Sequence, residues 1–280
     1  MKISPIDKSP VKFFNPLEMA AHLWQYRDLI RQLIWREVAG RYRGSFIGLG
    51  WSFVHPLTML FVYTFVFSVV FEAKWGVAEE SRLDFAMALF AGLITFGIFS
   101  EVITSAPTLI LANVNYVKRV VFPLEVLIMV RFLSALINAL FSLIILTAGF
   151  FLLNHFIHPT ILLLPVVWLP MAFFTLGCGY FMASLGVFIR DLGATVSIVN
   201  SMLFFLTPIF YPIRAVPENF QIICRINPIA LFVEDARRVV LWGVVPDWPR
   251  FFVSLIFCLS VLIFGFVWFM RSKKAFADVM

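Results

Sequence analysis

Residues 123–153 read PLEVLIMVRFLSALINALFSLIILTAGFFLL, an almost unbroken apolar run in which only Glu125 and Arg131 are charged, both near its beginning. The hydrocarbon core of a bilayer is about 30 Å thick, and about 20 consecutive apolar residues in an α-helix can cross it. The run is longer than that, so it predicts a membrane-spanning helix. Hydropathy indicates five further spans, at residues 46–71, 85–105, 160–189, 195–211 and 250–270.

The composition of the whole chain indicates the same class of protein. Of its 280 residues, 61% are hydrophobic and 14% are charged, and the mean hydropathy is +0.94. Soluble domains are about half apolar and a quarter charged, so a water-soluble fold is excluded. The three cysteines are scattered, with no CxxC and no metal-ligand spacing, and are expected to be small core residues. The sequence therefore predicts an all-α integral membrane protein without a metal site.

The orientation follows from where the positive charges lie. Six spans place both ends of the chain on one side, and most Lys and Arg residues fall on that side. Positively charged loops resist translocation, so both termini are expected in the cytoplasm. The net charge of +6 is then a topology signal and not a sign of nucleic-acid binding. The expected organisation is a cytoplasmic tail with an interface helix at 1–45, a transmembrane domain at 46–271 and a cytoplasmic tail at 272–280.

The segment before the first span has the pattern of an amphipathic helix. The first forty residues are mixed and charged, unlike a signal peptide, so the first span is expected to target the chain. Between residues 17 and 43, Met19, Leu23, Ile30 and Leu33 recur at three- and four-residue steps, and the remaining face is charged. Such a helix lies in the headgroup plane, either as a simple anchor or as a docking surface for an acidic partner.

Residues 207–248 form a segment between the fifth and sixth spans that is too polar to cross and too apolar for an ordinary loop. Its prolines interrupt any long helix, and irregular backbone at membrane depth requires protein or a water-filled cavity around it. A re-entrant helical pair at the outer face is the expected structure. The charged residues within it are expected in the external headgroup region or on a solvated face; they are Glu234, Asp235, Arg237 and Arg238.

Few ionisable residues lie in or near the spans, and these are the candidates for function. They are His55, Glu101, Glu125 and Arg131. Glu125 and Arg131 are six residues apart and do not share a helical face, so their partners are expected on other helices. The phosphate-binding pattern GxxxxGK[ST] is absent, so any ATP hydrolysis is expected in a separate polypeptide. No catalytic cluster is predicted.

Aromatic residues make up 17% of the chain, with 34 Phe, 8 Trp and 6 Tyr. Most are expected to face lipid or to pack between helices, and the tryptophans suit the headgroup belts. Aromatic faces also stack on the apolar faces of sugar rings, so a subset could line a path for a glycan. Composition favours the first of these interpretations.

Four blocks, in order along the chain, carry a resemblance to a known family. They are REVAGRYRGSFIGLGWSFVHPLTMLFVYTFVFSVVF at 36–71, NYVKRVVFPLEVL at 115–127, FIRDLG at 188–193, and LTPIFYPIRAVPENF with INPIALFVEDARR within 206–238. The chain resembles the ABC-2 type permeases that export polysaccharides, the family of the O-antigen, capsule and teichoic acid exporters. It departs from them at His55, where the family often has Asn, and at Ile128, where many members have proline.

The resemblance implies the architecture and the function. It implies six transmembrane helices, an N-terminal interface helix, re-entrant helices between the fifth and sixth spans, and a homodimer joined to two ABC ATPase subunits. ATP and Mg would bind those subunits, with no cofactor on this chain. The expected cargo is a lipid-linked polysaccharide, O-antigen foremost, carried from the cytoplasm across the bacterial inner membrane. Export of a small amphiphile or drug is the alternative, and a membrane-embedded glycan transferase is a third.

The resemblance also implies three sets of functional residues. The interface helix falls near 17–43, the coupling helix at 112–121 and the outer gate helices at 213–245. At the cytoplasmic entrance, where guanidinium groups suit a diphosphate, the candidates are Arg41, Tyr42 and Arg43. For coupling to the ATPase they are Asn115, Tyr116, Lys118 and Arg119. For the outer gate they are Pro208, Tyr211, Pro212, Asn227 and Pro228.

Overall fold

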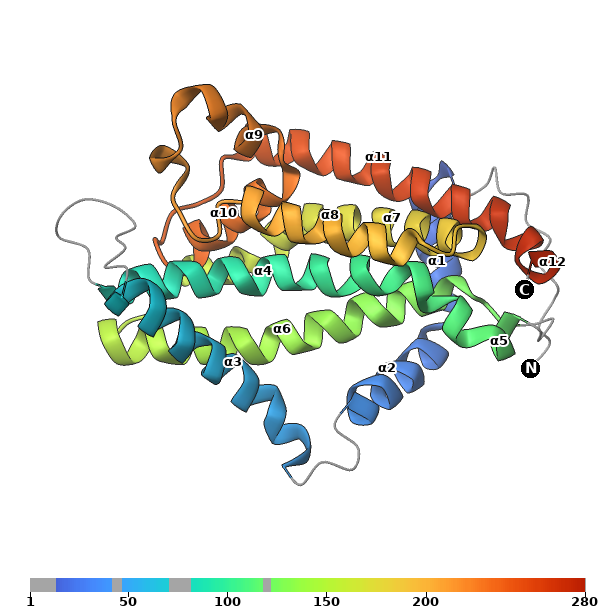
Figure 1. Ribbon diagram of the computed structural model, residues 1–280, viewed down its shortest axis with the longest axis horizontal. Coiled ribbons are helices and arrows are strands. Elements are labelled where there is room, and N and C mark those ends of the chain that lie inside the picture. The colour runs from blue at the N-terminus through green and yellow to red at the C-terminus, as the bar shows by residue number, and fades with distance from the viewer. Residues whose placement is uncertain (1–13, 42–46, 71–81, 118–121, 280) are drawn as a thin grey trace.

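The computed structural model describes residues 14–41, 47–70, 82–117 and 122–279, and every regular element in these ranges is a helix. The longest helices run roughly along one axis (Figure 1). They are α4 (Arg82–Leu109), α6 (Glu125–Asn154), α7 (Leu164–Phe188) and α11 (Trp248–Ser272).

Four helical stretches are long and apolar enough to cross a membrane. They are Leu83–Leu109, Glu125–Asn154, Pro159–Phe188 and Trp248–Ala275. The first of them is the centre of the bundle, because 78% of an apolar 18-residue stretch within it is buried, against 22% for the corresponding stretch of α6. The chain is therefore a multi-pass membrane protein whose outer helices present apolar side chains to lipid.

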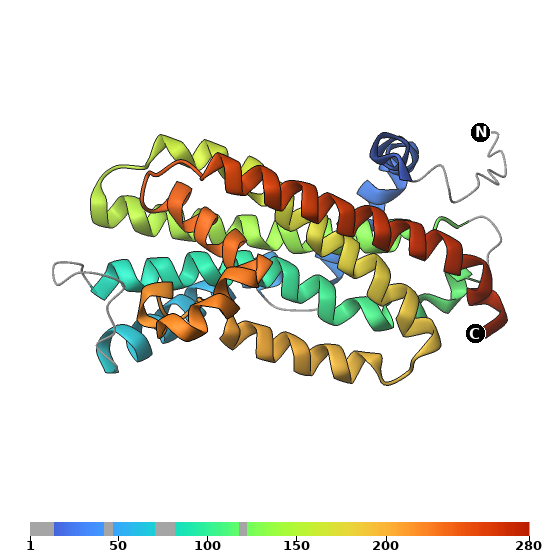
Figure 2. The ribbon, with the colours of Figure 1, turned by 90° about the horizontal axis from the view of Figure 1, so that it is seen from above.

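Two shorter apolar helices correspond to the predicted spans at 46–71 and 195–211. Helix α3 (Trp51–Tyr63) contains Pro56 and continues into the π-helical segment η3 (Thr64–Val70). Helix α8 (Leu192–Leu206) lies beside α4 along one edge of the bundle (Figure 2). Each is shorter than the four long stretches. All six predicted spans contain a long helix or helical segment, and four have the full length of a span. The predicted span at 195–211 extends too far, because α8 ends at Leu206 and residues 207–211 are not helical.

Close approach of backbones holds α7 against α11. A Cβ atom added to Gly265 would lie 2.0 Å from the carbonyl oxygen of Gly177, and one added to Gly177 would lie 2.6 Å from the backbone of Val261. Any side chain at these positions would separate the helices. Small residues at helix interfaces are the usual means of close packing in a membrane, where lipid removes the hydrophobic driving force between helices.

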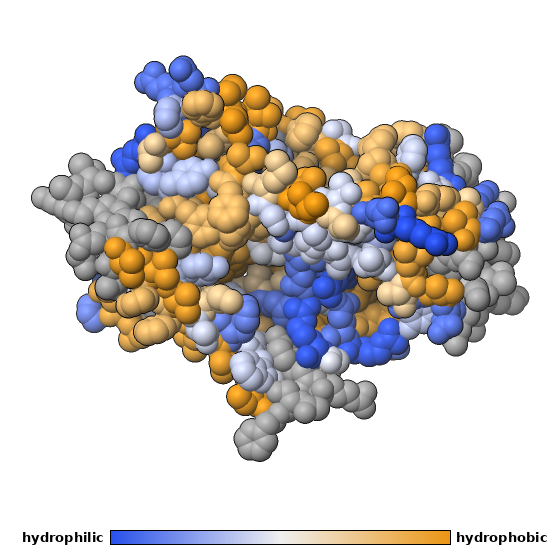
Figure 3. Space-filling model, in the orientation of Figure 1, coloured by the Kyte–Doolittle hydropathy of each residue, from blue (hydrophilic) through white to orange (hydrophobic). Residues whose placement is uncertain are grey.

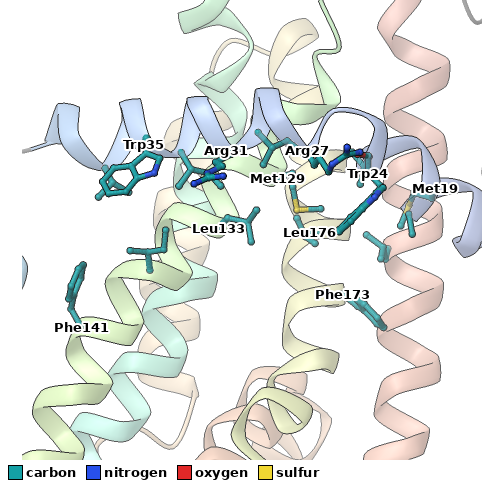
Figure 4. A pocket seen from close by; sticks show the side chains of 17 residues that line it. Met19, Trp24, Arg27, Arg31, Trp35, Met129, Leu133, Phe141, Phe173 and Leu176 are labelled. Carbon is teal, nitrogen blue, oxygen red and sulfur yellow. The ribbon is translucent and has the colours of Figure 1, made fainter.

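The segment predicted to form one interface helix forms two helices, α1 (Pro16–Gln25) and α2 (Arg27–Arg41), separated at Tyr26. Asn15 caps α1 by accepting a hydrogen bond from the Leu17 amide at 3.0 Å, and Pro16 occupies the first helical position. The two helices lie crosswise over the neighbouring bundle helices (Figure 4). The break lets α1 pack beside the first turn of α6 while α2 packs farther along the same helix.

The ends of the bundle carry the short elements. Near α1 lie η4 (Leu111–Asn113), α5 (Val114–Val117), η8 (Lys273–Ala275) and α12 (Phe276–Val279) (Figure 1). Toward the opposite end are η5 (Pro159–Leu163) and the connection between α8 and α11. That connection contains η6 (Ile213–Ala215), η7 (Glu218–Phe220), α9 (Gln221–Ile226) and α10 (Pro228–Val240).

Candidate functional site

Two arginines and two glutamates from three helices form one charge network. On α4, Glu101 pairs with Arg41 from the end of α2, and its Oε1 lies 3.8 Å from Nη2 of Arg131 on α6. Nη1 of Arg131 donates to Oε1 of Glu37 at 2.7 Å, and its Nε donates to Oγ of Ser105 at 3.0 Å. The four charges sum to zero, as expected where they lie against a low-dielectric interior.

This charge network lies at a hydrophilic part of the surface. Hydrophobic residues cover much of the face shown in Figure 3, and hydrophilic ones gather in the hollow between α2 and α3. The Arg41 and Glu101 side chains are 30% and 22% exposed, so solvent weakens their attraction, and such pairs typically contribute about 1 kcal/mol or less. The network therefore contributes little to stability.

A cavity of about 480 Å³ with both polar and apolar walls opens beside the network, between α3, α4 and α6. Its lining includes Arg41, Glu101, His55, Ser52 and Asn138. Oγ of Ser52 and both side-chain polar atoms of Asn138 are buried and have no hydrogen-bond partner among the described residues. Buried polar groups normally have partners, so these atoms are available to a hydroxyl-bearing ligand or to water.

A second cavity of about 450 Å³ continues along α4 toward α8. It shares Leu93, Gly97 and Glu101 with the first cavity, and we call the two together the polar strip. Its other walls combine aromatic and polar side chains; they include Tyr63, Phe96, Ser100, Asn200, Phe204 and Phe205. The polar strip thus connects the charged residues near Arg41 with an aromatic section.

The charged run at 234–238 was expected in the headgroup region or on a solvated face. It contains the most buried charged side chain among the described residues. Arg237 on α10 is 0% exposed. Its Nε donates to the Ala88 carbonyl on α4 at 2.7 Å, and Nη1 and Nη2 donate to the carbonyls of Pro208 and Ile209 at 2.7 and 2.9 Å. The expectation was wrong for Arg237, because its guanidinium satisfies backbone carbonyls inside the protein.

Burial disfavours the charged form of Arg237 and lowers its pKa to about 9, so it is still protonated at neutral pH. Space for it comes from Gly92, where an added Cβ would lie 2.5 Å from Nη2. Spacing alone could have identified Arg237, since Ala230, Val233, Arg237 and Val240 share one helical face and the other three are apolar.

The predicted outer-gate residues lie around the base of the α8–α11 connection. Oδ1 of Asn227 accepts from the Ile229 amide at 3.0 Å and caps α10, while its Nδ2 donates to Oγ1 of Thr207 at 2.9 Å. Pro228 is the first residue of α10, and Pro212 precedes η6. The Tyr211 hydroxyl donates to the Phe205 carbonyl at 2.8 Å, and the Pro208 carbonyl accepts from Arg237. These contacts hold the connection in shape; a gating role stays a prediction.

At the other end, Glu125 joins three separate parts of the chain. Its Oε1 lies 2.8 Å from Nε2 of His22 on α1, and its Oε2 accepts from Nζ of Lys273 at 2.7 Å. The Tyr180 hydroxyl donates to the Glu125 backbone carbonyl at 3.1 Å. The prediction that Glu125 and Arg131 find partners on other helices is confirmed, and each has two charged or ionisable partners.

The coupling candidates are only partly described. The ring of Tyr116 on α5 stacks on Phe122 with 4.1 Å between centroids, and the Arg36 guanidinium lies 5.9 Å from the Tyr116 ring. Asn115 is exposed beside it. The candidates Lys118 and Arg119, like the entrance candidates Tyr42 and Arg43, lie outside the described residues. Helix α5 is thereby linked to α2 through the Arg36–Tyr116 contact.

Long apolar helices, with ion pairs and the polar strip between them, define a multi-pass membrane protein. Residues 28–241 match the family described as ABC-2 type transporter. The chain belongs to this family.

Related proteins match over most of their length. An O-antigen export system permease protein of Myxococcus xanthus is 29% identical over 82% of this chain and 87% of its own. A protein with the same description from Klebsiella pneumoniae is 26% identical over 94% of this chain and 99% of its own. A polysialic acid transport protein of Escherichia coli is 24% identical over 88% of this chain and 94% of its own.

Proposed function

We propose that this chain is the membrane subunit of an ATP-driven exporter that moves a lipid-linked polysaccharide, O-antigen foremost, out of the cytoplasm across the bacterial inner membrane. The observation that carries the proposal is the near full-length similarity to permeases described as exporting O-antigen and polysialic acid. The family membership supports it, and so does a polar strip inside an otherwise apolar bundle.

The working unit in this proposal is a pair of these chains with two ABC ATPase subunits, which bind ATP and Mg. Helices α3 and α8 complete a set of six spans, the α8–α11 connection enters the outer leaflet, and both termini are cytoplasmic. Exposed apolar side chains on α3 and α8, among them Phe61, Met202 and Phe205, offer a surface for the second copy. The ATPase subunits would dock near α2 and α5.

The polar strip is the proposed path of the glycan. Hydroxyl and amide groups, such as Ser52, Asn138 and Asn200, can exchange hydrogen bonds with sugar hydroxyls one at a time. Aromatic faces, such as Phe96 and Phe204, can stack on the apolar faces of sugar rings. This combination binds each sugar weakly, and a polymer has to pass many such contacts.

Arg41 is the proposed contact for the diphosphate of the cargo, with Tyr42 and Arg43 beside it in sequence. A guanidinium binds phosphate oxygens in a two-pronged geometry. Since Arg41 pairs with Glu101 in the present structure, the diphosphate would have to replace that carboxylate. Changing Arg41 and Arg43 together to Gln should abolish export from an assembled complex. A matched loss of two charges from exposed positions outside the polar strip, Arg190→Gln with Arg271→Gln, should leave export working; equal export by both variants would contradict the assignment.

Deletion of the gene in its native host tests the function itself. We expect finished lipid-linked polymer to accumulate in the cytoplasm while the cell surface lacks it. Normal surface glycan would point instead to export of a small amphiphile, and loss of polymer synthesis would point to a transferase. Chemical analysis of the trapped polymer would identify the cargo.

A further inference from the structure

An apolar crevice of about 830 Å³ lies beneath α1 and α2 and is separate from the polar strip. Figure 4 shows it between these crosswise helices and the upright helices of the bundle. Its walls are almost entirely apolar; they include Met19, Leu23, Met129, Leu133, Phe173 and Leu176. None of the residues that line this crevice also lines the polar strip.

The rim of the crevice is basic and aromatic. Arg27 and Arg31 on α2 line it, together with Trp24 and Trp35, whose residues are 70% and 63% exposed. The Arg27 guanidinium lies 5.7 Å from the Trp24 ring centroid. Among the described residues, neither arginine forms an ion pair with a carboxylate. The rim therefore presents two positive charges directly above an apolar cavity.

We propose that the crevice binds one anionic phospholipid, with an acyl chain between α6 and α7 and its phosphate held by Arg27 and Arg31. An amphipathic helix that crosses the ends of spanning helices lies at headgroup depth, where exposed tryptophans are also favoured. Basic pockets between spanning helices are typical sites for anionic lipid headgroups. The bound lipid would fasten α1 and α2 to the bundle.

The cargo of the proposed exporter also contains a lipid and a phosphate. The crevice is separate from the polar strip, however, and this argues against the cargo as the occupant of the crevice. A polymer leaving through the polar strip would have to enter at Arg41 and Glu101, whereas the crevice opens on the flank formed by α6, α7 and α11. A second copy of this chain is also disfavoured. A two-fold contact through this rim would bring four arginines together, and no carboxylate is among the residues that line the crevice.

Lipid retention by the purified chain, measured by native mass spectrometry, tests the proposal. The probes are phosphatidylglycerol and phosphatidylcholine with identical acyl chains, added in turn to delipidated protein. We expect phosphatidylglycerol to be retained as a single tightly held adduct. Arg27→Gln with Arg31→Gln should weaken that retention about 30-fold and leave phosphatidylcholine unchanged. The control, Arg190→Gln with Arg271→Gln, removes the same charge from exposed positions outside the crevice and should retain the adduct.

A second variant tests the apolar part of the site. Ala20 lines the crevice from an exposed position on α1, so Ala20→Trp fills the cavity while both arginines remain. It should lose retention of phosphatidylglycerol although the protein stays folded. Equal retention of both lipids by the wild type, or equal losses in the arginine and control pairs, would overturn the proposal. Efficient cross-linking of a Trp35→Cys variant to a second copy would also overturn it. These outcomes do not depend on export, so failure here leaves the proposed function untouched.

Discussion

Arg237 offers the sharpest test of how the α8–α11 connection is held. Its guanidinium joins α10 to the Ala88 carbonyl on α4 and to the carbonyls of Pro208 and Ile209. The residues in the first of these contacts are 149 positions apart in the chain. Arg237→Met keeps a similar side-chain length and removes all three donors.

The expected cost follows from the three carbonyls left behind. Hydrogen bonds from a charged donor contribute about 1.5–3 kcal/mol each, and an unpaired buried acceptor has lost its water as well. The substitution also removes the desolvation penalty of a buried charge, which is several kcal/mol and partly offsets this loss. Removal of one partner of a buried charged set typically destabilises by about 3–5 kcal/mol, and we expect a value in that range for Arg237→Met.

The melting temperature of the purified protein in detergent, followed by tryptophan fluorescence, measures this effect. A loss of about 3–5 kcal/mol should lower the melting temperature by roughly 10 °C. Arg237→Lys should recover little of it, because one ammonium group cannot reproduce the planar fork of donors. The neighbouring Arg238 is the control. Its Nη2 donates to the Val245 carbonyl at 3.1 Å near the surface, so Arg238→Met should lower the melting temperature much less.

Equal melting temperatures for Arg237→Met and Arg238→Met would refute this reasoning. They would mean that the three carbonyls find other partners at no cost when the guanidinium is removed. If Arg237→Met were destabilised and Arg237→Lys had the wild-type melting temperature, the positive charge alone would explain the effect. The planar geometry of the guanidinium donors would then not matter.

Three further predictions concern other parts of the fold. Burial raises the pKa of Asp235 to about 6, above the value near 4 of an unfolded chain, so the fold loses stability as the carboxyl ionises with rising pH. Asp235→Asn should therefore have the melting temperature of the wild type at pH 4 and a higher one at pH 8. A lower melting temperature than the wild type at pH 8 would contradict burial as the cause of the raised pKa. Asn227→Ala removes the cap of α10 and should lower the free energy of unfolding by about 1 kcal/mol in a denaturation series. An unchanged free energy of unfolding would count against the capping contact. Gly265→Val should prevent α11 from packing on Gly177 and give little folded protein in the membrane, whereas Gly97→Ala, with open space around its Cβ, should accumulate normally.

The long spans were predictable because length and apolar character are local properties of a sequence. Residues 123–153 needed no knowledge of the rest of the chain, and α6 covers Glu125–Asn154. The break at Tyr26 was not predictable in the same way. The apolar residues on both sides of Tyr26 keep one periodic pattern, and the separation into α1 and α2 depends on where each packs along α6.

The contacts of the candidate site were predictable only where the sequence spacing excluded an ion pair within one helix. The six-residue separation of Glu125 and Arg131 correctly indicated partners on other helices. The identities of those partners, His22, Lys273 and Glu37 among them, depend on contacts across about a hundred residues or more. Arg237 was missed because a charged run resembles a surface, although its spacing from Ala230 and Val233 places it on the apolar face of α10.

Reconstitution tests the central claim most directly. The purified chain and its ATPase subunit would be placed in sealed proteoliposomes with lipid-linked polysaccharide, and polymer reaching the far side would be measured by its access to an added glycosidase. The account predicts that polymer crosses only when ATP and both subunits are present. Polymer that stays in place, while ATP drives a small amphiphile across, would contradict it.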